Sequence, residues 1–281
     1  MNQLYTSAIR KASEIRLKLN LDLFQPVNIY DICSVMDIDV QFVDINMEGN
    51  YVNKMGIPRI LLSCLRPFPR RVFTCAHELG HHVFNHGLKI DLISDENEDA
   101  SFKSHDEKIV DAFAAALLMP IGGIQSEFLK RNLSFSRAKP IEFYTISSIF
   151  GVGFQTLVTH CKVNQLINDS KSIELLKFTP AKIFKAEFGD VGEKSFFKII
   201  DSESELKSID LEVANHIVLP SDFVVDDNFL EKKNETRIGS LFIAKKPGIS
   251  SVCSNKNDIS YFIRIQPKNY IGYAEYRHLE N

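Results

Sequence analysis

The chain has 281 residues, of which 44% are hydrophobic and 25% are charged, and it contains 10 Pro and 13 Gly. This composition is that of a globular protein with a substantial core, and it excludes wholesale disorder, a collagen-like chain and a coiled coil. At about 150 residues per domain, the length predicts two domains. The 33 Lys and Arg against 36 Asp and Glu give a net charge of -3, so no global positive field attracts nucleic acid or anionic lipid.

The sequence carries no pattern that indicates export or membrane insertion. Its first twenty residues alternate polar and apolar side chains at helical spacing and lack the continuous apolar core of a secretory signal. The longest stretch without Asp, Glu, Lys or Arg, Phe143 to Cys161, has too many polar residues to span a bilayer. The five cysteines are widely spaced and form no C-x-x-C pair, which is typical of reduced and mostly buried thiols. We therefore expect a cytoplasmic protein with no membrane partner.

Hydrophobic periodicity and turn residues predict a succession of helices and strands over the first half of the chain. In chain order, we expect a helix over residues 1–20, a helix from Ile29 to Met36 capped by Asn28, a strand from Ile38 to Val43, a turn over residues 45–55, a strand from Ile57 to Ser63 and a helix from about Arg70 to Asn85. An acidic stretch from Asp91 to Asp99 is expected to be a solvated loop. After it, an apolar helix from about Asp106 to Met119 ends at Pro120.

The second half of the chain changes in character. Between Pro140 and Leu166, two short helical patterns flank Phe150-Gly151-Val152-Gly153 with a spacing like that of a helix-turn-helix. The second pattern, FQTLVTHCK, has too few basic and amide side chains to read DNA, so we expect it to pack in the fold. From about Ile173, the runs AKIFKAEF, SFFKII, HIVLP, SLFIAKK, SYFIRIQ and YIGYAEY predict a separate β-rich α+β domain, with one helix near Ser202 to Ala214.

The segment His77-Glu78-Leu79-Gly80-His81 has the pattern H-E-x-x-H, whose spacing has a chemical reason. Residues i and i+4 lie on one face of a helix, so the His77 and His81 imidazoles can reach the same metal ion. Glu78 is then placed as the general base for the water that attacks a peptide carbonyl. His82 falls on another part of the helix and is expected to be structural.

Two histidines do not complete a catalytic zinc site, because a third protein ligand is needed. In the metzincin pattern the third His follows the first by ten residues, but that position is Gly87 here, and His86 is out of register. The remaining source of a third protein ligand is a second helix that crosses the first. Glu107 begins the apolar helix, and Asp111 follows one turn later on the same face, so both are candidate ligands.

The pairing of RRVFTCAHELGHH with an acidic residue and FAAALLMP about thirty residues later resembles the ImmA/IrrE family of zinc metallopeptidases. The segment FQPVNIYDICSVMDIDVQF is similar to the opening helix and strand of that family, so the resemblance covers about residues 5–125. The helix-turn-helix-like segment, to about residue 168, also lies where the family has a similar segment. The family pattern E-x-E-A-N-x-F-A-A-x-L-L-M-P places its first Glu, which is the third zinc ligand, on Glu107. Ile109, Val110 and Asp111 depart from the pattern, which leaves Asp111 as a competing ligand or as a partner that orients a histidine.

The resemblance over the first part of the chain, together with the change in sequence character from about Ile173, predicts an α+β fold in three parts. A zincin-like metallopeptidase head, with a short β-sheet and the H-E-x-x-H helix, is expected over residues 1–125. A helical, helix-turn-helix-like segment is expected over residues 126–172, and the β-rich α+β domain over residues 173–281 is expected to be a sensor or a substrate-docking module.

The resemblance also implies the roles of the site residues. His77, His81 and Glu107 are expected to bind Zn²⁺, with Glu78 as the catalytic base, although an N/N/O site also suits other first-row divalent ions. The chemistry further requires a donor that stabilises the oxyanion. The sequence offers three candidates for this donor, namely Tyr51, His105 and His160.

The function implied by the resemblance is proteolysis of narrow specificity. Family members cleave helix-turn-helix repressors and so relieve repression in stress responses or on mobile elements. The expected partner is therefore a repressor protein, and direct nucleic-acid binding is disfavoured by the net charge. The alternative is a non-proteolytic anti-repressor that sequesters a DNA-binding partner and uses the metal to brace its fold. Structural zinc sites usually have four ligands and many cysteines, which favours the enzyme.

Overall fold

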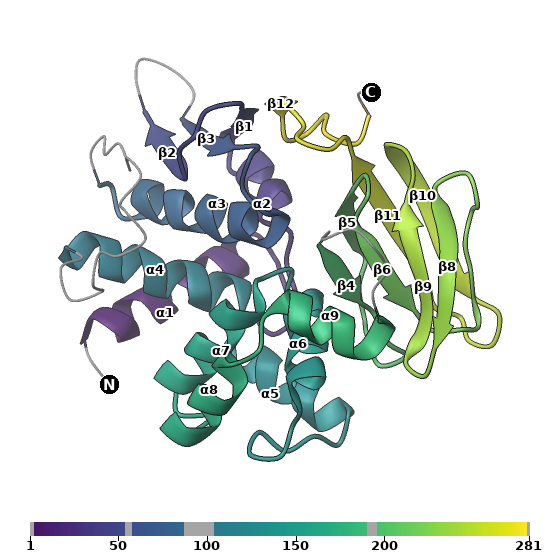
Figure 1. The fold of residues 1–281 in the computed structure, drawn as a ribbon. Coiled ribbons are helices and arrows are strands. Elements are labelled where there is room, and N and C mark those ends of the chain that lie inside the picture. The colour runs from purple at the N-terminus through teal and green to yellow at the C-terminus, as the bar shows by residue number, and fades with distance from the viewer. Residues whose placement is uncertain (1–2, 54–57, 87–103, 190–195, 280–281) are drawn as a thin grey trace. The chain divides into compact units, whose positions relative to one another are not determined.

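A computed structural model of the chain describes residues 3–53, 58–86, 104–189 and 196–279 (Figure 1). The expected acidic loop from Asp91 to Asp99 lies outside these residues. Within them, helices and strands are mixed, in agreement with the predicted α+β class. The chain divides into two compact units, the first formed by Met1–Ser126 with Asn269–Glu275 and the second by Glu127–Lys268 with Tyr276–Asn281.

The first unit carries the helices and strands predicted for the first half of the chain. In chain order, it holds α1 (Gln3–Lys18), α2 (Ile29–Val35), β1 (Asp39–Val43), β2 (Gly49–Val52), β3 (Arg59–Ser63), α3 (Phe68–Val83), α4 (His105–Leu118), the start of α5 (Ile121–Lys130) and β12 (Gly272–Tyr273). The predicted helices and the strands β1 and β3 are confirmed. Asn28 caps α2 as expected, because its side-chain oxygen accepts from the backbone N–H groups of Tyr30 and Asp31.

The sheet of the first unit has four strands in the order β12-β1-β3-β2. Strands β1 and β3 are parallel, while β12 and β2 run antiparallel to their neighbours. The turn predicted over residues 45–55 is wrong in part, because β2 pairs with β3 there; a strand of 4 residues is too short to show a periodic pattern. Residues 269–275, which the sequence places among the C-terminal strands, supply β12 to this sheet.

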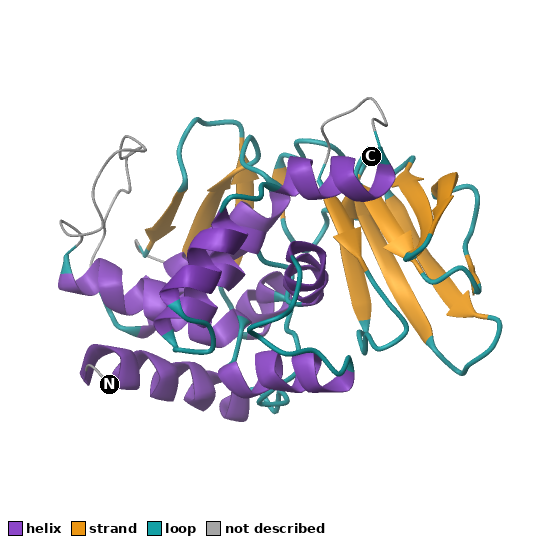
Figure 2. Cartoon of the chain, turned by 60° about the horizontal axis from the view of Figure 1, so that its bottom comes forward, coloured by secondary structure: helices purple, strands orange, loops and turns teal. Residues whose placement is uncertain are grey.

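Helix α3 lies against β2 and β3 on one side and against α4 on the other, and α4 also packs on α1 (Figure 1). Figure 2 shows these helices gathered on one face of the sheet. Val110, Phe113 and Leu117 of α4 are fully buried in this arrangement. The run from His105 to Lys130 is long and apolar enough to cross a bilayer, but 56% of an apolar 18-residue stretch within it is buried in the protein, as in the core helix of a globular domain.

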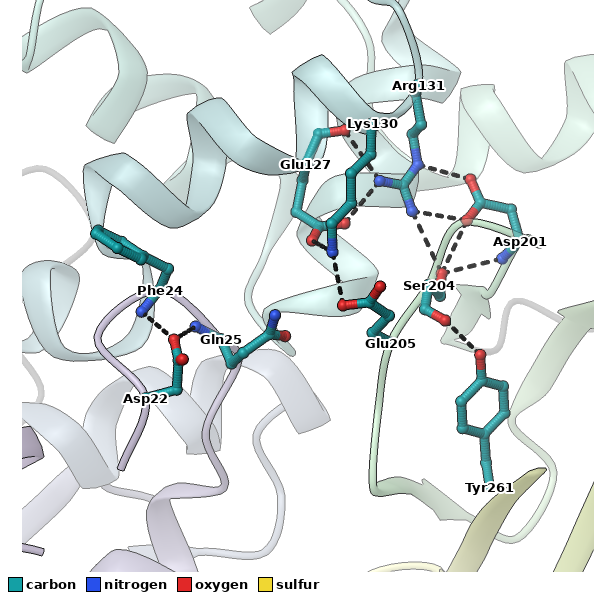
Figure 3. Close-up of polar contacts among 10 residues, drawn as sticks. All are labelled: Asp22, Phe24, Gln25, Glu127, Lys130, Arg131, Asp201, Ser204, Glu205 and Tyr261. Atoms are coloured by element: carbon teal, nitrogen blue, oxygen red, sulfur yellow. Dashed lines mark hydrogen bonds and ion pairs between the residues drawn. The ribbon is translucent and has the colours of Figure 1, made fainter. Parts of the chain in front are cut away.

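Arg16 joins α1 to the end of α4. Its side chain is buried and donates to the carbonyl of Leu117 through Nε (3.1 Å) and Nη2 (2.6 Å). Nη1 donates to the carbonyls of Asp22 (2.6 Å) and Gln25 (2.8 Å) in the loop that follows α1. The Asp22 carboxylate in turn accepts from the backbone N–H groups of Phe24 (2.7 Å) and Gln25 (2.9 Å), which holds this loop in place (Figure 3).

The second unit combines helices with two sheets. After the rest of α5 come α6 (Pro140–Ile149), α7 (Phe154–Val163), α8 (Asp169–Leu176), α9 (Pro180–Phe188), β4 (Phe197–Ile199), β5 (Ser208–Glu212), β6 (His216–Leu219), β7 (Phe223–Val224), β8 (Leu230–Thr236), β9 (Gly239–Ala244), β10 (Gly248–Ser254) and β11 (Ser260–Gln266). The strand orders are β5-β11-β10-β7 and β4-β6-β9-β8. Leu211 and Ile263 from one sheet and Ile217 and Phe242 from the other belong to one buried cluster.

Two expectations for the second unit are wrong. AKIFKAEF, expected as a strand, forms α9, because Thr179 caps it and Pro180 pre-forms its first turn. The helix expected near Ser202 to Ala214 is replaced by β5, which pairs in parallel with β11. In β5, Ile209 and Leu211 enter the core at a period of two, and two apolar residues among polar neighbours are too few to distinguish a strand from a helix.

The two short helices predicted around Phe150 to Gly153 are α6 and α7, which are bent by 98° from each other. Gly151 between them has a φ of 67°, in the left-handed region that favours glycine. The buried Tyr144 of α6 donates its hydroxyl to the carbonyl of Phe197 (2.7 Å) and stacks on the ring of Phe197, with 4.0 Å between centroids. These contacts pack α6 against β4.

Arg131, which directly follows α5, ties this helix to the segment before β5 (Figure 3). Nη1 donates to the Glu127 carboxylate (2.6 Å), and Nε and Nη2 donate to the Asp201 carboxylate at 2.7 and 2.6 Å. Ser204 extends the network, because its carbonyl accepts from the hydroxyl of Tyr261 in β11. The Arg131 side chain is 8% exposed, so this bidentate pair is shielded from solvent.

We predict that Arg16→Met destabilises the protein by about 3 kcal/mol, because the carbonyls of Leu117, Asp22 and Gln25 lose a buried charged donor. Urea denaturation measures the change. Arg10→Met is the matched control, since the Arg10 side chain on the same helix is 77% exposed, and it should shift the free energy of unfolding by less than about 0.5 kcal/mol. Equal losses for the two variants would contradict the role assigned to Arg16.

Candidate metal centre

Helix α3 carries the H-E-x-x-H motif, and its sequence explains where the helix begins and which side faces the core. Pro69 stands in the first turn, where the missing N–H group costs no helical hydrogen bond. One side of the helix is apolar and buried, including Val72, Cys75 and Leu79. The motif therefore lies on a buried helix that is held between the sheet and α4.

Gly80, inside the motif, allows α3 and α4 to approach closely. A β-carbon at this position would lie 2.9 Å from Cβ of Val110 and 3.2 Å from Cδ1 of Phe113. Real Cβ atoms do not approach a neighbouring carbon this closely without displacing it. The glycine thus sets the distance at which the start of α4 meets the two histidines of α3.

Three of the residues predicted to bind metal converge at this crossing. Nε2 of His77 lies 3.2 Å from Nε2 of His81, and the Glu107 carboxylate lies 3.1 Å from the former nitrogen and 3.6 Å from the latter. One ligand atom from each residue lies within 4.8 Å of the others. Two imidazole nitrogens and one carboxylate oxygen are a donor set that suits zinc, so the residues present fit a divalent metal ion.

The electrostatics of the group favour an ionised carboxylate. Contacts with the imidazoles of His77 and His81 hold the pKa of Glu107 well below its ordinary value, although partial burial opposes the shift. The His81 side chain is 2% exposed, and that of Glu107 is 21% exposed, so the group opens to solvent on the Glu107 side. A cation would therefore meet a deprotonated carboxylate at neutral pH.

Asp111, the competing ligand, lies on the other side of the His77 ring. Its Oδ1 is 2.9 Å from Nδ1 of His77, whereas Glu107 meets Nε2. This arrangement is that of a carboxylate that orients a ligand: it accepts from Nδ1–H and leaves Nε2 for the metal. The contacts thus place Glu107 beside the Nε2 atoms of His77 and His81, and Asp111 beside Nδ1 of His77.

Glu78 is buried on the face of α3 that meets β2. Its side chain lies beside Gly49, where an added β-carbon would be 3.1 Å from Oε1 of Glu78 and 2.5 Å from Cγ2 of Thr74. The residue is 2% exposed, in keeping with a base that is protected from bulk water. The structure thus brings all four predicted residues, His77, Glu78, His81 and Glu107, to one region of the first unit.

The remaining histidines and the oxyanion candidates differ in position. Nδ1 of His82 is 2.7 Å from the Tyr51 hydroxyl of β2, and partial burial lowers the pKa of His82. His105 is exposed at the start of α4. His160 belongs to the second unit, where its Nδ1 lies 3.3 Å from the side-chain nitrogen of Asn164.

His86, set aside as a ligand because of its register, contacts the site in another way. Its Nδ1 lies 3.1 Å from Nδ1 of His81, and its Nε2 lies 3.7 Å from Oδ1 of Asp106. Sequence reasoning missed this contact, because helical spacing says nothing about a residue beyond the end of the helix. The available signal was Asn85, a residue that often ends helices in the left-handed conformation.

Residues 33–162 match the model of peptidase family M78, which is described as the IrrE N-terminal-like domain. The matched span begins within α2 and ends in α7, and it contains every residue of the site described above. A comparison with curated proteins gives no match.

We predict that the two carboxylates of α4 differ in their effect on metal affinity. Glu107→Ala should abolish tight zinc binding, because it removes a ligand, whereas Asp111→Ala should weaken binding by about 10- to 100-fold, as expected for a residue that orients a ligand. Competition with a chromophoric chelator measures both affinities. Full zinc affinity in Glu107→Ala together with loss in Asp111→Ala would exchange the two roles.

Proposed function

We propose that this chain, which belongs to the ImmA/IrrE family of peptidases through residues 33–162, is a zinc-dependent endopeptidase of narrow specificity. The observation that carries the proposal is the convergence of His77, His81 and Glu107, with Glu78 buried on the same helix as the two histidines. A site with three protein ligands leaves room for water and substrate, in contrast to a closed structural site. Another first-row divalent ion with similar preferences could serve in place of zinc.

The chain's own residues supply acid–base chemistry and orientation. When bound, a divalent ion would polarise a peptide carbonyl and lower the pKa of water. Glu78 accepts the proton of the attacking water and then delivers it to the nitrogen of the leaving amine. Asp111 keeps His77 in the tautomer that presents Nε2, and Glu107 contributes a negative charge that balances the metal.

The proposed substrate is a helix-turn-helix transcriptional repressor, cleaved in the cytoplasm so that repression is relieved. Family membership supports this choice, and the net charge of -3 favours a protein substrate over direct binding to DNA. Such regulatory cleavage fits a stress response or the control of a mobile element. Narrow specificity also means that degradation of a general substrate such as casein is not expected.

We predict that the wild-type protein, loaded with zinc, cuts the repressor encoded nearest its gene at one bond. Glu78→Gln should retain zinc and lose cleavage by about 100-fold or more, because the general base is absent. His81→Ala should lose both zinc and cleavage. Intact-mass analysis of the repressor measures cleavage, and elemental analysis of the purified protein measures zinc.

Glu14→Gln is the matched control for this experiment. Glu14 lies on α1 with its side chain 49% exposed, so the variant should cleave like the wild type. Equal cleavage by Glu78→Gln would remove Glu78 from the mechanism. A stable complex of the repressor with both wild type and Glu78→Gln, without cleavage, would replace the peptidase by an anti-repressor that sequesters its partner.

A further inference from the structure

We propose that His86 is a positioning residue that fixes the tautomer and ring orientation of His81, and that Asp106 in turn holds His86. The inference rests on the proposed metal binding by His77, His81 and Glu107. It assigns to the end of α3 and the start of α4 a second orienting arrangement, distinct from the contact between Asp111 and His77.

The backbone at the end of α3 brings His86 back toward the helix. Asn85 has a φ of 55°, in the left-handed region, and its N–H donates to the carbonyl of His82 (3.1 Å). The N–H of His86 donates to the carbonyl of His81 (3.0 Å). These two bonds form a Schellman motif, which reverses the chain after the last helical turn. The motif returns the residue after Asn85 to the side of the helix that carries His81.

Neighbouring rings hold the His86 side chain in this position. Its imidazole stacks on Phe84, with 5.8 Å between ring centroids and 22° between planes. Phe84 in turn packs edge-on against Phe113 of α4, with centroids 5.9 Å apart. The His86 side chain is 14% exposed. It is therefore fixed by the same pair of helices that bring the metal ligands together.

The hydrogen-bonding requirements of the two imidazoles are mutually consistent. If Nε2 of His81 binds a metal, the proton of the neutral ring is on Nδ1, which must donate to Nδ1 of His86. Nδ1 of His86 is then an acceptor, so the proton of its ring is on Nε2, which faces the Asp106 carboxylate. Metal binding thus selects one tautomer for each ring, and Asp106 favours the tautomer required of His86.

The two histidine ligands are therefore supported by different chemistry. His77 donates to a carboxylate at 2.9 Å, the common arrangement for a metal-binding histidine. With a metal on its Nε2, His81 would donate through Nδ1 to the neutral imidazole of His86, 3.1 Å away, and the carboxylate of Asp106 would support His81 only through His86. Asp106 and Glu107 are adjacent in α4, so one helical turn supplies both a ligand and the support for another ligand.

Zinc affinity of the full-length chain tests this proposal without a substrate. We expect His86→Ala to weaken zinc binding by about 10- to 100-fold. His86→Gln, whose amide oxygen can accept from Nδ1–H of His81, should recover most of that affinity. Asp106→Ala should cause a smaller loss than His86→Ala, because the Asp106 side chain is 44% exposed and its contact is longer. Competition with a chelator gives the affinities, and thermal melting of the metal-free proteins verifies that each variant is folded.

His82→Ala is the matched control, because His82 is adjacent to His81 but contacts Tyr51. It should bind zinc like the wild type. Long-range ¹⁵N–¹H spectra of the zinc-loaded protein provide a second readout: the wild type should show His81 protonated on Nδ1, with a proton that exchanges more slowly than in His86→Ala. If His86→Ala melts at a reduced temperature, the zinc affinity of His86→Gln and these spectra decide whether His86 orients His81 or only stabilises the fold.

Two kinds of failure are distinguishable. If the wild-type protein binds no zinc, the proposed function fails, and the inference fails with it. If the wild type binds zinc but His86→Ala binds it equally tightly, or if His86→Gln recovers no affinity, the role of His86 is overturned while the proposed peptidase stands.

Discussion

The close contact between α3 and α4 is the constraint on which the site depends. Gly80 has no side chain to hold the helices apart, and the gap that it leaves is filled by Val110 and Phe113 of α4. At this separation the start of α4 reaches His77 and His81, so that Glu107 can meet both Nε2 atoms. The geometry of the candidate metal centre thus depends on core packing: apolar burial along the two helices sets their separation, and this separation fixes the distances between the polar groups at the crossing. A mutation that widens this crossing would alter metal affinity even where no ligand is replaced.

The candidate site could be predicted to the extent that its geometry is local. His77, Glu78 and His81 follow from helical periodicity alone, since their relative positions are set within one turn of α3. Glu107 lies on another helix, and residue spacing alone made Glu107 and Asp111 equal candidates for the third ligand. The family pattern favoured Glu107. In the structure, Glu107 contacts Nε2 of His77 and Asp111 contacts Nδ1 of the same ring. His86 could not be found by register, because a left-handed residue reverses the chain before it.

The fold shows the same division between local and distant causes. The helices α1 to α4, α6 and α7 and the strands β1 and β3 have clear hydrophobic patterns and turn residues in the sequence, and their predictions are confirmed. Strand β2 was missed because a short edge strand depends on its neighbour more than on its own sequence. The segments that form α9 and β5 were assigned wrongly for opposite reasons. In α9, Thr179 and Pro180 start a helix within a run that is rich in β-forming residues. In β5, pairing with β11 produces a strand from a polar sequence whose pattern resembles that of a helix.

Strand β12 has a consequence for how the protein is made. The H-E-x-x-H helix and three strands of its sheet lie in the first part of the chain, but the fourth strand comes from residues 269–275. Gly272 and Tyr273 pair with Phe42 and Gln41 of β1, and the Tyr270 ring packs edge-on against Phe42. During synthesis, the edge of β1 stays unpaired until this late segment leaves the ribosome. The sheet beside the H-E-x-x-H helix is therefore completed only after residues 127–268 have been synthesised, so the first unit and its candidate site depend on a strand that is made after most of the second unit.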